Sequence, residues 1–558
     1  MVATAVAVPV LVGGRDGIVL GLLSDTDAYT RVNRIIASVE AGRVLDHVPR
    51  DNSGDAVPLH WTHLLDALIM AIALPLRAFM DWSEATRLAG AAIGPLSTLA
   101  VALAAVGALR AILPGAGAIL ATGALAALGP HVLDYGAFGR ADHHVLHGAV
   151  ALAAPALAYA ATRFDAGARL AIAGGAVGGL GVWLSPEPLP FILFGWALTL
   201  LSDTRPVDRT RLRALSFAGG YLGAVALGWA VDPPSGGRFA TEIDRLSWPY
   251  VELGLLMVAA SAAAPRATRR FGGAWPAAIV AGAVAAAALA LWLAHYPAVL
   301  RGTEGIFSPA GVERFWRHVE EMRPVDSVHK LVFYLLLPAL TLAAAAGWLV
   351  HRRRDPVAVL VALGVVFALA VSARHLRFGI YAALAAAVAA GVALELLVLR
   401  RPVAMRLLTA TAVVLGFVFL PVVAGKLAGA DPVAPAHGAC DVSRLRGALA
   451  SLAGKVVLSE SSATPALVFF TPVTVVAGPY HRAEAHLLAL IDANAERGFR
   501  AGIPESFKRT KAVAALACRR SEAADGTLGA ALRDGVPPDW LEERPIPPDP
   551  GFRLYVLK

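Results

Sequence analysis

The sequence predicts a polytopic α-helical membrane protein that carries a C-terminal α/β domain outside the cytoplasm. Hydrophobic residues make up 57% of the 558 residues and charged residues 16%, whereas a soluble chain carries roughly 25% charged residues. Apolar runs of about 20 residues, the length that crosses a bilayer as a helix, recur up to residue 427. After that point the chain becomes polar, and short β-like runs alternate with helix-like stretches.

Thirteen apolar runs are predicted to span the membrane. A further run at 63–80 can either cross the bilayer or lie on it as an interfacial amphipathic helix. If it does not cross, the basic loops DTRPVDRTRLR, PRATRRFGG, HRRRD and RRPVAMR all face the cytoplasm, as the positive-inside rule requires. We therefore expect an interfacial helix there and about 13 spans, at residues 5–23, 88–110, 114–133, 144–162, 168–184, 187–201, 212–231, 249–264, 275–297, 329–350, 356–372, 378–398 and 405–427.

This topology places three segments outside the cytoplasm. They are the loop 24–87, the loop 298–328, and everything from residue 428 onward. Residues 1–427 are thus predicted to form a transmembrane domain and residues 428–558 a small α/β domain. Cys440 and Cys518, the two cysteines of the chain, both lie in the second domain, where an oxidising compartment would let them form a disulfide.

The first outer loop begins with two carboxylates, in the stretch LLSDTDAYTRVNRI. Asp25 and Asp27 are spaced so that both can ligate a hard divalent cation, which prefers oxygen ligands. The alternative is that one of them caps the helix that begins at this point.

A second cluster precedes the fourth span, in the stretch YGAFGRADHHVLHGAV. Asp142 and His144 stand two residues apart at a helix start, so both can point into one cavity on the outer face. His143 is expected to point elsewhere, and the role of His147, about one turn further on, stays open between a position behind the ligands and a polar residue facing the cavity. The alternative is a polar cap with solvated histidines.

Two further clusters are predicted on the same face. Glu320 and Glu321 lie in the loop 298–328, where a carboxylate is often only solvated. Arg374 and Arg377 lie in the stretch SARHLRFGIY, against the positive-inside trend. Outward-facing arginine suits a phosphate ligand, because guanidinium binds phosphate through two hydrogen bonds, and the alternative is snorkelling of the side chains to the interface.

Together these clusters predict a cation site beside a phosphate site. Carboxylates and histidine suit Mg²⁺ or Mn²⁺, and a cation can neutralise the departing phosphate of a lipid-linked donor.

Five stretches, in order along the chain, resemble motifs of the catalytic subunits of oligosaccharyltransferases, which belong to the GT-C integral-membrane glycosyltransferases. DTDAYTR is similar to the Asp-x-Tyr and Arg motif of the first loop, LHWTHLLD to a His-Trp-x-x-Leu-x-Asp element, and GRADHHVLHG to the archaeal Gly-x-x-Asp-His-His motif. EEMRP resembles a Glu-x-x-Pro loop motif, and RHLRFGIY the Arg-Phe-x-x-Tyr start of a late span. The resemblance covers nearly the whole chain and implies a GT-C fold.

The resemblance also implies roles for single residues. Asp27, Asp142, His144 and Glu321 would ligate the cation, and Asp27 would also contact the acceptor, with Asp25 as its competitor. The remaining assignments are Arg374 or Arg377 for the donor phosphate, His60 and Trp61 as structural residues of the first loop, and His147, Arg31 and Tyr29 behind the ligands.

The chain departs from the family pattern at three places. The Trp-Trp-Asp-Tyr-Gly motif that binds the sequon is missing, because the comparable stretch VVLSESSATPALVFF has no Trp. Tyr135 stands where the family has an Arg, with Arg140 as the only Arg nearby, and His147 replaces an acidic residue. The stretch VVAGPYHR, residues 475–482, has no predicted role.

The resemblance implies a metal-assisted, inverting glycosyltransferase at the outer face of the cytoplasmic membrane. The composition, rich in Gly and poor in Lys, suggests that the organism is a bacterium. Its donor would be a polyprenyl-(pyro)phosphate sugar or oligosaccharide, and its acceptor a lipid, glycan or protein. The missing sequon motif leaves open a single-sugar transferase of the aminoarabinose or mannosyl type. A transporter of lipid-linked glycans would need midplane polar residues and internal repeats, and the spans are almost free of charge.

Overall fold

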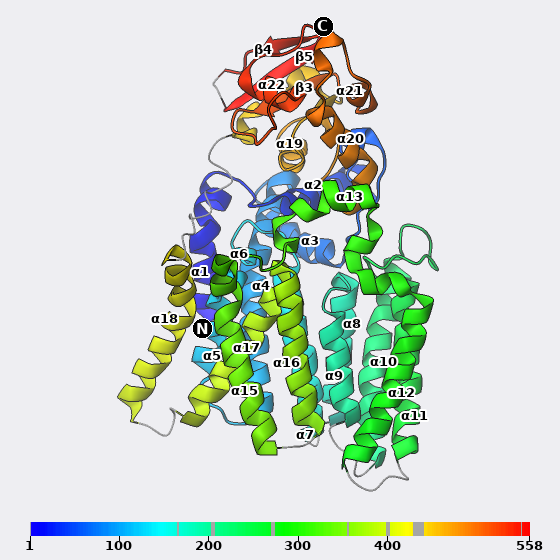
Figure 1. Ribbon diagram of the computed structural model, residues 1–558, viewed down its shortest axis with the longest axis vertical. Helices are drawn as coiled ribbons and strands as arrows, with labels where there is room; N and C mark the ends of the chain where they lie inside the picture. The colour runs from blue at the N-terminus through cyan, green and yellow to red at the C-terminus, as the bar shows by residue number, and fades with distance from the viewer. Residues whose placement is uncertain are drawn as a thin grey trace.

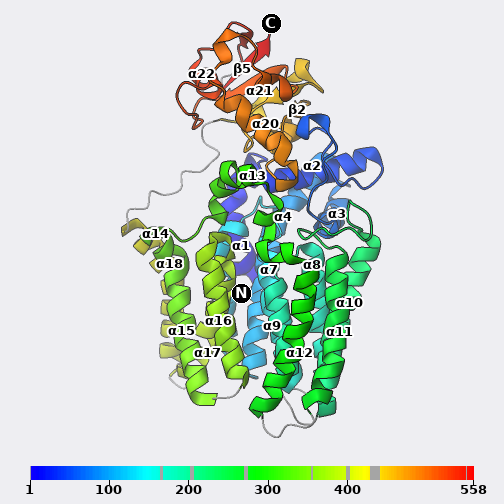
Figure 2. The same cartoon turned by 45° about the vertical axis from the view of Figure 1, so that its right-hand side comes forward.

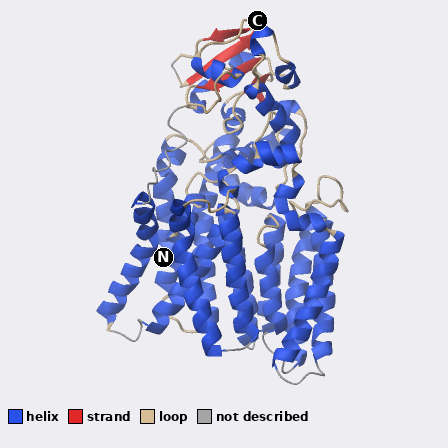
Figure 3. Cartoon of the chain, viewed as in Figure 1, coloured by secondary structure: helices blue, strands red, loops and turns tan. Residues whose placement is uncertain are grey.

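The computed structural model in Figure 1 describes residues 2–163, 167–201, 207–268, 274–353, 356–397, 402–427, 440–547 and 550–558. A bundle of long helices forms the lower part, a layer of short helices and loops lies above it, and a separate domain lies on top (Figures 1 and 2). Figure 3 shows the strands gathered in that top domain, which carries the C-terminus.

A helix stands at each of the thirteen predicted spans. Within the part of the chain that the structure describes, nine helices are long and apolar enough to cross a membrane, and α1, α5 and α9 are shorter apolar helices. The chain is a multi-pass membrane protein, and the number of spans stays a prediction. The bundle helices are α1 (Val2–Gly14), α4 (Trp82–Ile112), α5 (Ile119–Leu128), α7 (His144–Arg163), α8 (Gly167–Leu184), α9 (Leu189–Leu201), α10 (Val207–Val231), α11 (Trp248–Thr268), α12 (Ala274–His295), α15 (Leu337–Arg353), α16 (Pro356–Arg374), α17 (Gly379–Leu397) and α18 (Val403–Leu427).

Small residues let these helices pack closely. In α8, Gly175 and Gly179 lie on the face that meets α10, and a Cβ atom added at Gly175 would collide with the backbone carbonyl of Phe217. In lipid, where burial of apolar surface does not drive helix association, close backbone approach of this kind supplies the packing energy.

The basic loops used to orient the chain lie partly outside the described residues, so the orientation stays a prediction.

The outer layer contains short helices that position the polar clusters. α3 has 13 residues, too few to cross a bilayer of ordinary thickness, and it lies above the bundle in both views (Figures 1 and 2). Leu68 and Leu74 of this helix are exposed. Exposed leucines are compatible with a helix that lies on the membrane surface, and this position of α3 stays a prediction. The layer contains α2 (Thr26–Ala41), α3 (Leu64–Leu76), α6 (Pro130–Tyr135), α13 (Pro309–Arg314) and α14 (Val328–Lys330).

The top domain is built on a five-stranded sheet of order β2-β1-β3-β5-β4. β1 pairs in parallel with β2 and β3, whereas β5 pairs antiparallel with β3 and β4. A disulfide joins Cys440 to Cys518 within this domain. Its elements are β1 (Val456–Leu458), α19 (Thr464–Phe470), β2 (Thr474–Val475), α20 (Glu484–Ala495), α21 (Glu505–Arg509), β3 (Ala514–Cys518), α22 (Leu528–Asp534), β4 (Leu541–Arg544) and β5 (Phe552–Leu557).

The stretch 475–482, which had no predicted role, docks the top domain onto the membrane domain. His481 Nε2 lies 2.6 Å from Asp244 Oδ2, and Arg482 donates to Asp244 and Glu242 at 2.6 to 2.7 Å. Glu484 accepts hydrogen bonds from the backbone N–H and the hydroxyl of Ser308, in the loop that also carries Glu321. The top domain therefore fixes two outer loops of the membrane domain at once.

Candidate metal and phosphate site

The polar clusters predicted from the sequence converge where α2 and α7 begin, above the bundle. Each of Asp27, Asp142 and His144 can offer one ligand atom such that these atoms lie within 4.8 Å of one another. Asp27 sits in the first turn of α2, Asp142 just before α7, and His144 is the first residue of α7. Two oxygen ligands and one imidazole nitrogen in this arrangement fit a divalent cation such as Mg²⁺ or Mn²⁺.

Asp25 is not available as a competitor of Asp27, so that expectation is corrected. One carboxylate oxygen of Asp25 accepts a hydrogen bond from Ala28 N at 2.7 Å and caps α2. The other oxygen lies 2.7 Å from Arg140 Nε. Because both oxygens are engaged, the capping alternative describes Asp25, whereas Asp27 belongs to the group of possible cation ligands.

The pKa values of Asp27 and Asp142 are shifted in opposite directions. Burial raises the pKa of Asp27 well above its usual range, and the charges of Asp142 and Asp25 raise it further. Burial also raises the pKa of Asp142, but His144 and His143 beside it lower that pKa more, so it lies well below its usual range. A cation bound between the two carboxylates would relieve the repulsion that raises the pKa of Asp27.

Glu321 reaches the site from the outer loop. It lies in the 3₁₀ turn Glu320–Met322, and its Oε2 accepts a hydrogen bond from the Tyr135 hydroxyl at 2.8 Å. Its Oε1 lies 3.3 Å from Arg377 Nη1. The charge of Glu321 is close enough to contribute to the raised pKa of Asp27. Tyr135, which stands where the family has an Arg, thus holds the loop carboxylate over the site.

Arg377 lies at the centre of the site. Its Nη2 donates to Glu187 Oε2 at 2.7 Å and lies 2.9 Å from His144 Nδ1. Arg374, predicted with it as a phosphate ligand, is not part of the site. The side chain of Arg374 is 66% exposed and lies 3.8 Å from Glu304. α16 ends at Arg374 and the chain turns before α17, so the two arginines do not share a face.

Glu187 is a central residue that the sequence analysis did not identify. Its Oε1 accepts a hydrogen bond from the Tyr381 hydroxyl at 2.7 Å, and its Oε2 pairs with Arg377. The residue stands between α8 and α9 in the stretch SPEPLPF. A carboxylate at the edge of an apolar span was the available signal, because such a group needs a partner.

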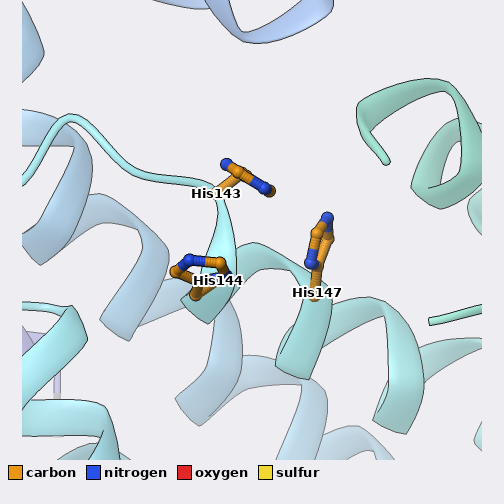
Figure 4. Close-up of side chains that lie close together, drawn as sticks. All are labelled: His143, His144 and His147. Carbon is orange, nitrogen blue, oxygen red and sulfur yellow. The ribbon is translucent and has the colours of Figure 1, made fainter. Parts of the chain in front are cut away.

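His143 belongs to the same cluster, contrary to the expectation that it points elsewhere. Its Nδ1 lies 2.9 Å from Asp142 Oδ1, and its ring centroid lies 4.6 Å from that of His144 and 4.7 Å from that of His147. The three rings gather around the first turn of α7 (Figure 4). His143 precedes the helix, so its side chain is not bound to the helical spacing that motivated the expectation.

Arg31 and Tyr29, both predicted to lie behind the ligands, differ in their surroundings. Arg31 lies behind His143, with its Nη2 3.4 Å from His143 Nδ1 and its Nη1 3.0 Å from Asp66. Tyr29 faces away from the ligands, because its hydroxyl accepts from Leu23 N and its ring packs on Phe469.

His60 and Trp61 lie in the first loop, as expected of structural residues. The His60 ring lies 4.3 Å from the ring of His481, which ties this loop to the top domain. The backbone carbonyl of Trp61 accepts a hydrogen bond from Arg34, and its ring lies under Arg31.

Comparison with known proteins rests on structure. No protein-family model matches the chain, and no curated protein matches it. The archaeal oligosaccharyltransferase AglB from Archaeoglobus fulgidus, solved with an inhibitory peptide and a dolichol-phosphate, superposes with a TM-score of 0.68 at 13% identity over 100% of this chain and 74% of that chain. A structure of the Archaeoglobus fulgidus oligosaccharyltransferase with Zn and sulfate gives a TM-score of 0.63 at 12% identity, over 93% of this chain and 68% of that chain.

A looser likeness relates the chain to ArnT from Cupriavidus metallidurans, with a TM-score of 0.38 at 15% identity over 96% of this chain and 93% of that chain. That score is too low to support an argument about fold. The superposition on the oligosaccharyltransferase, over the whole length of this chain, is the informative one. The chain therefore has the GT-C fold of the oligosaccharyltransferase catalytic subunits, a helical membrane domain followed by a C-terminal sheet domain.

Proposed function

We propose that this chain is a metal-assisted membrane glycosyltransferase that takes a sugar or oligosaccharide from a polyprenyl-(pyro)phosphate donor. The observation that carries the proposal is the convergence of Asp27, Asp142 and His144 beside Arg377. A cation ligand set next to a buried arginine suits the departure of a phosphate group. The structural neighbour from Archaeoglobus fulgidus was solved with a dolichol-phosphate, which supports a lipid-linked donor. We also propose that the site faces the outside of a bacterial cytoplasmic membrane.

The ligand set fits a cation, provided that one proton on the ring of His144 moves from Nε2 to Nδ1. Arg377 donates to His144 Nδ1, so in this arrangement the proton of the neutral ring is on Nε2, which lies 3.2 Å from Asp142. To ligate a cation through Nε2, His144 must carry its proton on Nδ1 instead. Glu187 Oε2 lies 3.9 Å from Nδ1 and would have to move within hydrogen-bond distance to accept this N–H group.

This proton shift would release the guanidinium for the donor. An N–H group on His144 Nδ1 cannot accept from Arg377, so Arg377 would keep Glu187 as its partner and turn its remaining N–H groups to the phosphate. A bound cation would neutralise charge on the leaving phosphate. Asp27 would contact the acceptor and orient it for in-line displacement at the anomeric carbon, which inverts the configuration.

The acceptor is proposed to be something other than a glycosylation sequon. The stretch after β1, where the family carries its Trp-Trp-Asp-Tyr-Gly motif, contains no Trp. In its place α19 packs Phe469 and Phe470 against Tyr29, which fills the area with apolar contacts. This observation favours a single-sugar transferase that modifies a lipid or polysaccharide.

The test is transfer by the purified full-length chain in lipid vesicles, with a polyprenyl-phosphate sugar or a polyprenyl-pyrophosphate sugar as donor and mass spectrometry as readout. Asp27→Asn and Asp142→Asn are each expected to lower the rate by about a hundredfold or more, as removal of a group that stabilises transition-state charge does. EDTA should abolish transfer, and Mg²⁺ or Mn²⁺ should restore it.

Asp134→Asn is the matched control. Asp134 is an exposed carboxylate that lies 3.5 Å from Arg140 and contacts none of the ligands, so its variant should keep the rate within about threefold. Retention of transfer by Asp27→Asn would refute the proposed role of the cluster.

A further inference from the structure

The imidazoles of His143, His144 and His147 meet at the beginning of α7. His144 and His147 are three residues apart on one face of α7, and His143, which precedes the helix, has its ring centroid 4.6 Å from that of His144 and 4.7 Å from that of His147. Each ring can offer one nitrogen such that the three nitrogens lie within 4.8 Å of one another. Figure 4 shows the three rings around this turn.

His147 is the feature that the glycosyl-transfer site does not explain. Its side chain is fully buried, and neither ring nitrogen has a hydrogen-bond partner among the described residues. The nearest carboxylate oxygen, Glu187 Oε1, lies 3.7 Å from Nδ1, beyond hydrogen-bond distance. Burying an imidazole without partners is unfavourable, and a ligand that takes its lone pair would remove that penalty.

The surroundings of His143 also suit metal binding. His143 Nδ1 lies against Asp142 at 2.9 Å, which leaves Nε2 free. A histidine that ligates a metal usually donates its other N–H group to a carboxylate or a carbonyl in this way. Glu187 lies further from His147, at 3.7 Å, but its charge and that of Asp142 are both close enough to the trio to offset the charge of a cation.

We propose that His143, His144 and His147 form a second cation site, selective for a zinc-like divalent metal. Three nitrogen ligands favour such a cation over Mg²⁺ or Mn²⁺, which prefer oxygen. Because His144 belongs to both ligand sets, the two sites are alternatives and one cation is bound at a time. A zinc-like cation at the trio would therefore remove His144 from the oxygen-rich site. Binding of such a cation does not depend on the proposed function. Only the consequence that the bound cation inhibits sugar transfer rests on it.

The test uses the purified full-length chain in detergent, stripped with a chelator and titrated with Co²⁺ alone. A tetrahedral nitrogen-rich site gives Co²⁺ an intense visible absorption, whereas an octahedral oxygen-rich site gives a weak one. We expect the intense band in the wild-type chain and in Asp27→Asn, and its loss in His147→Ala and His143→Ala. His131→Ala, which removes another buried histidine outside the trio, is the matched control and should keep the band.

Two measurements on the wild-type chain make the outcome independent of how the variants fold. X-ray absorption of the chain loaded with Zn²⁺ should show three imidazole ligands. Zn²⁺ should also displace Mn²⁺ one for one, as followed by the electron paramagnetic resonance signal of the released Mn²⁺. One imidazole around Zn²⁺, or a Co²⁺ band that survives both trio variants and is lost in Asp27→Asn, would overturn the site. Simultaneous binding of Zn²⁺ and Mn²⁺ would overturn the sharing of His144. Failure of the wild-type chain to transfer sugar would refute the proposed function and leave these metal measurements unchanged.

Discussion

Glu187 and Arg377 form an ion pair of 2.7 Å that joins the loop before α9 to the turn before α17. The side chains are 11% and 16% exposed, so neither charge is well solvated. The pair therefore holds the guanidinium of Arg377 in place beside His144 and Glu321.

Replacing Glu187 with Ala is expected to destabilise the chain markedly, because the charge of Arg377 would lose its closest partner while staying buried. Breaking a buried pair in this way costs about 3–5 kcal/mol. The midpoint of thermal unfolding of the detergent-solubilised chain measures the effect. Glu304→Ala, which removes a carboxylate 3.8 Å from the exposed Arg374, should change stability by no more than about 0.5 kcal/mol.

Arg377 and Arg374 are expected to differ sharply in their contribution to transfer. Arg377→Lys keeps the positive charge but loses the planar pair of N–H donors, so we expect about a hundredfold lower kcat/KM for the lipid-linked donor. Arg374→Lys should stay within about threefold of the wild-type chain. Equal losses in the two variants would show that both arginines contact the donor.

Tyr135→Phe is expected to loosen Glu321 without unfolding the chain. The substitution removes the 2.8 Å hydrogen bond to the loop carboxylate, a neutral donor to a charged acceptor worth about 1.5–3 kcal/mol. If Glu321 acts in the reaction, kcat should fall about tenfold or more while the KM of the donor stays nearly unchanged. Steady-state kinetics with varied donor separates these two effects, and a rise in KM alone would place Tyr135 in donor binding instead.

Arg482→Ala is expected to weaken the docking of the top domain. Arg482 pairs with Glu242 and Asp244 in the membrane domain, and its removal leaves the buried Asp244 with His481 alone. We expect faster limited proteolysis between the two domains and a loss of about 2–4 kcal/mol. Arg509→Ala, which removes an exposed pair with Asp492 inside the top domain, should leave the proteolysis rate unchanged.

Asp51 makes the stability of the chain depend on pH. Burial raises its pKa from 3.8 to about 7, and hydrogen bonds from Asn52 N and Tyr480 lower it only in part. The protonated form is thus favoured in the folded state, so its stabilising contribution is complete below about pH 3.8 and is lost as the pH rises through about 7.

The chain should consequently be less stable at pH 8 than at pH 5, by on the order of 2–4 kcal/mol from this residue. Asp51→Asn should remove that part of the pH dependence, as measured by thermal unfolding across this range. An identical pH profile in the variant would show that Asp51 is ionised in the folded chain.

The positions of the helices could be predicted because an apolar run of spanning length leaves few alternatives. The helix α4 and the polar segment that starts at Cys440 both follow from composition alone. The site was predictable in part, since Asp27, Asp142 and His144 each stand at a helix start. Their mutual distance was not predictable, because it depends on how α2 and α7 each pack against α4.

The rest of the site depended on contacts that are distant in sequence. Glu187 stands between two prolines at the edge of an apolar run, and nothing local shows that its partner is Arg377. The role of the docking stretch 475–482 could not be predicted either, because its partners Glu242 and Asp244 lie far away in the sequence, in a loop of the membrane domain. Arg374 and Arg377 are three residues apart and looked equivalent, and only the end of α16 between them separates their surroundings.

The bond between Glu484 and Ser308 has a consequence for biosynthesis. Glu484 opens α20, which is translated after all the helices of the bundle, yet it holds the loop that carries Glu321. While the ribosome is still synthesising the top domain, this loop lacks its anchor and the carboxylate is not held over the site. The arrangement of the site is therefore complete only after the top domain has been synthesised and has folded onto the membrane domain.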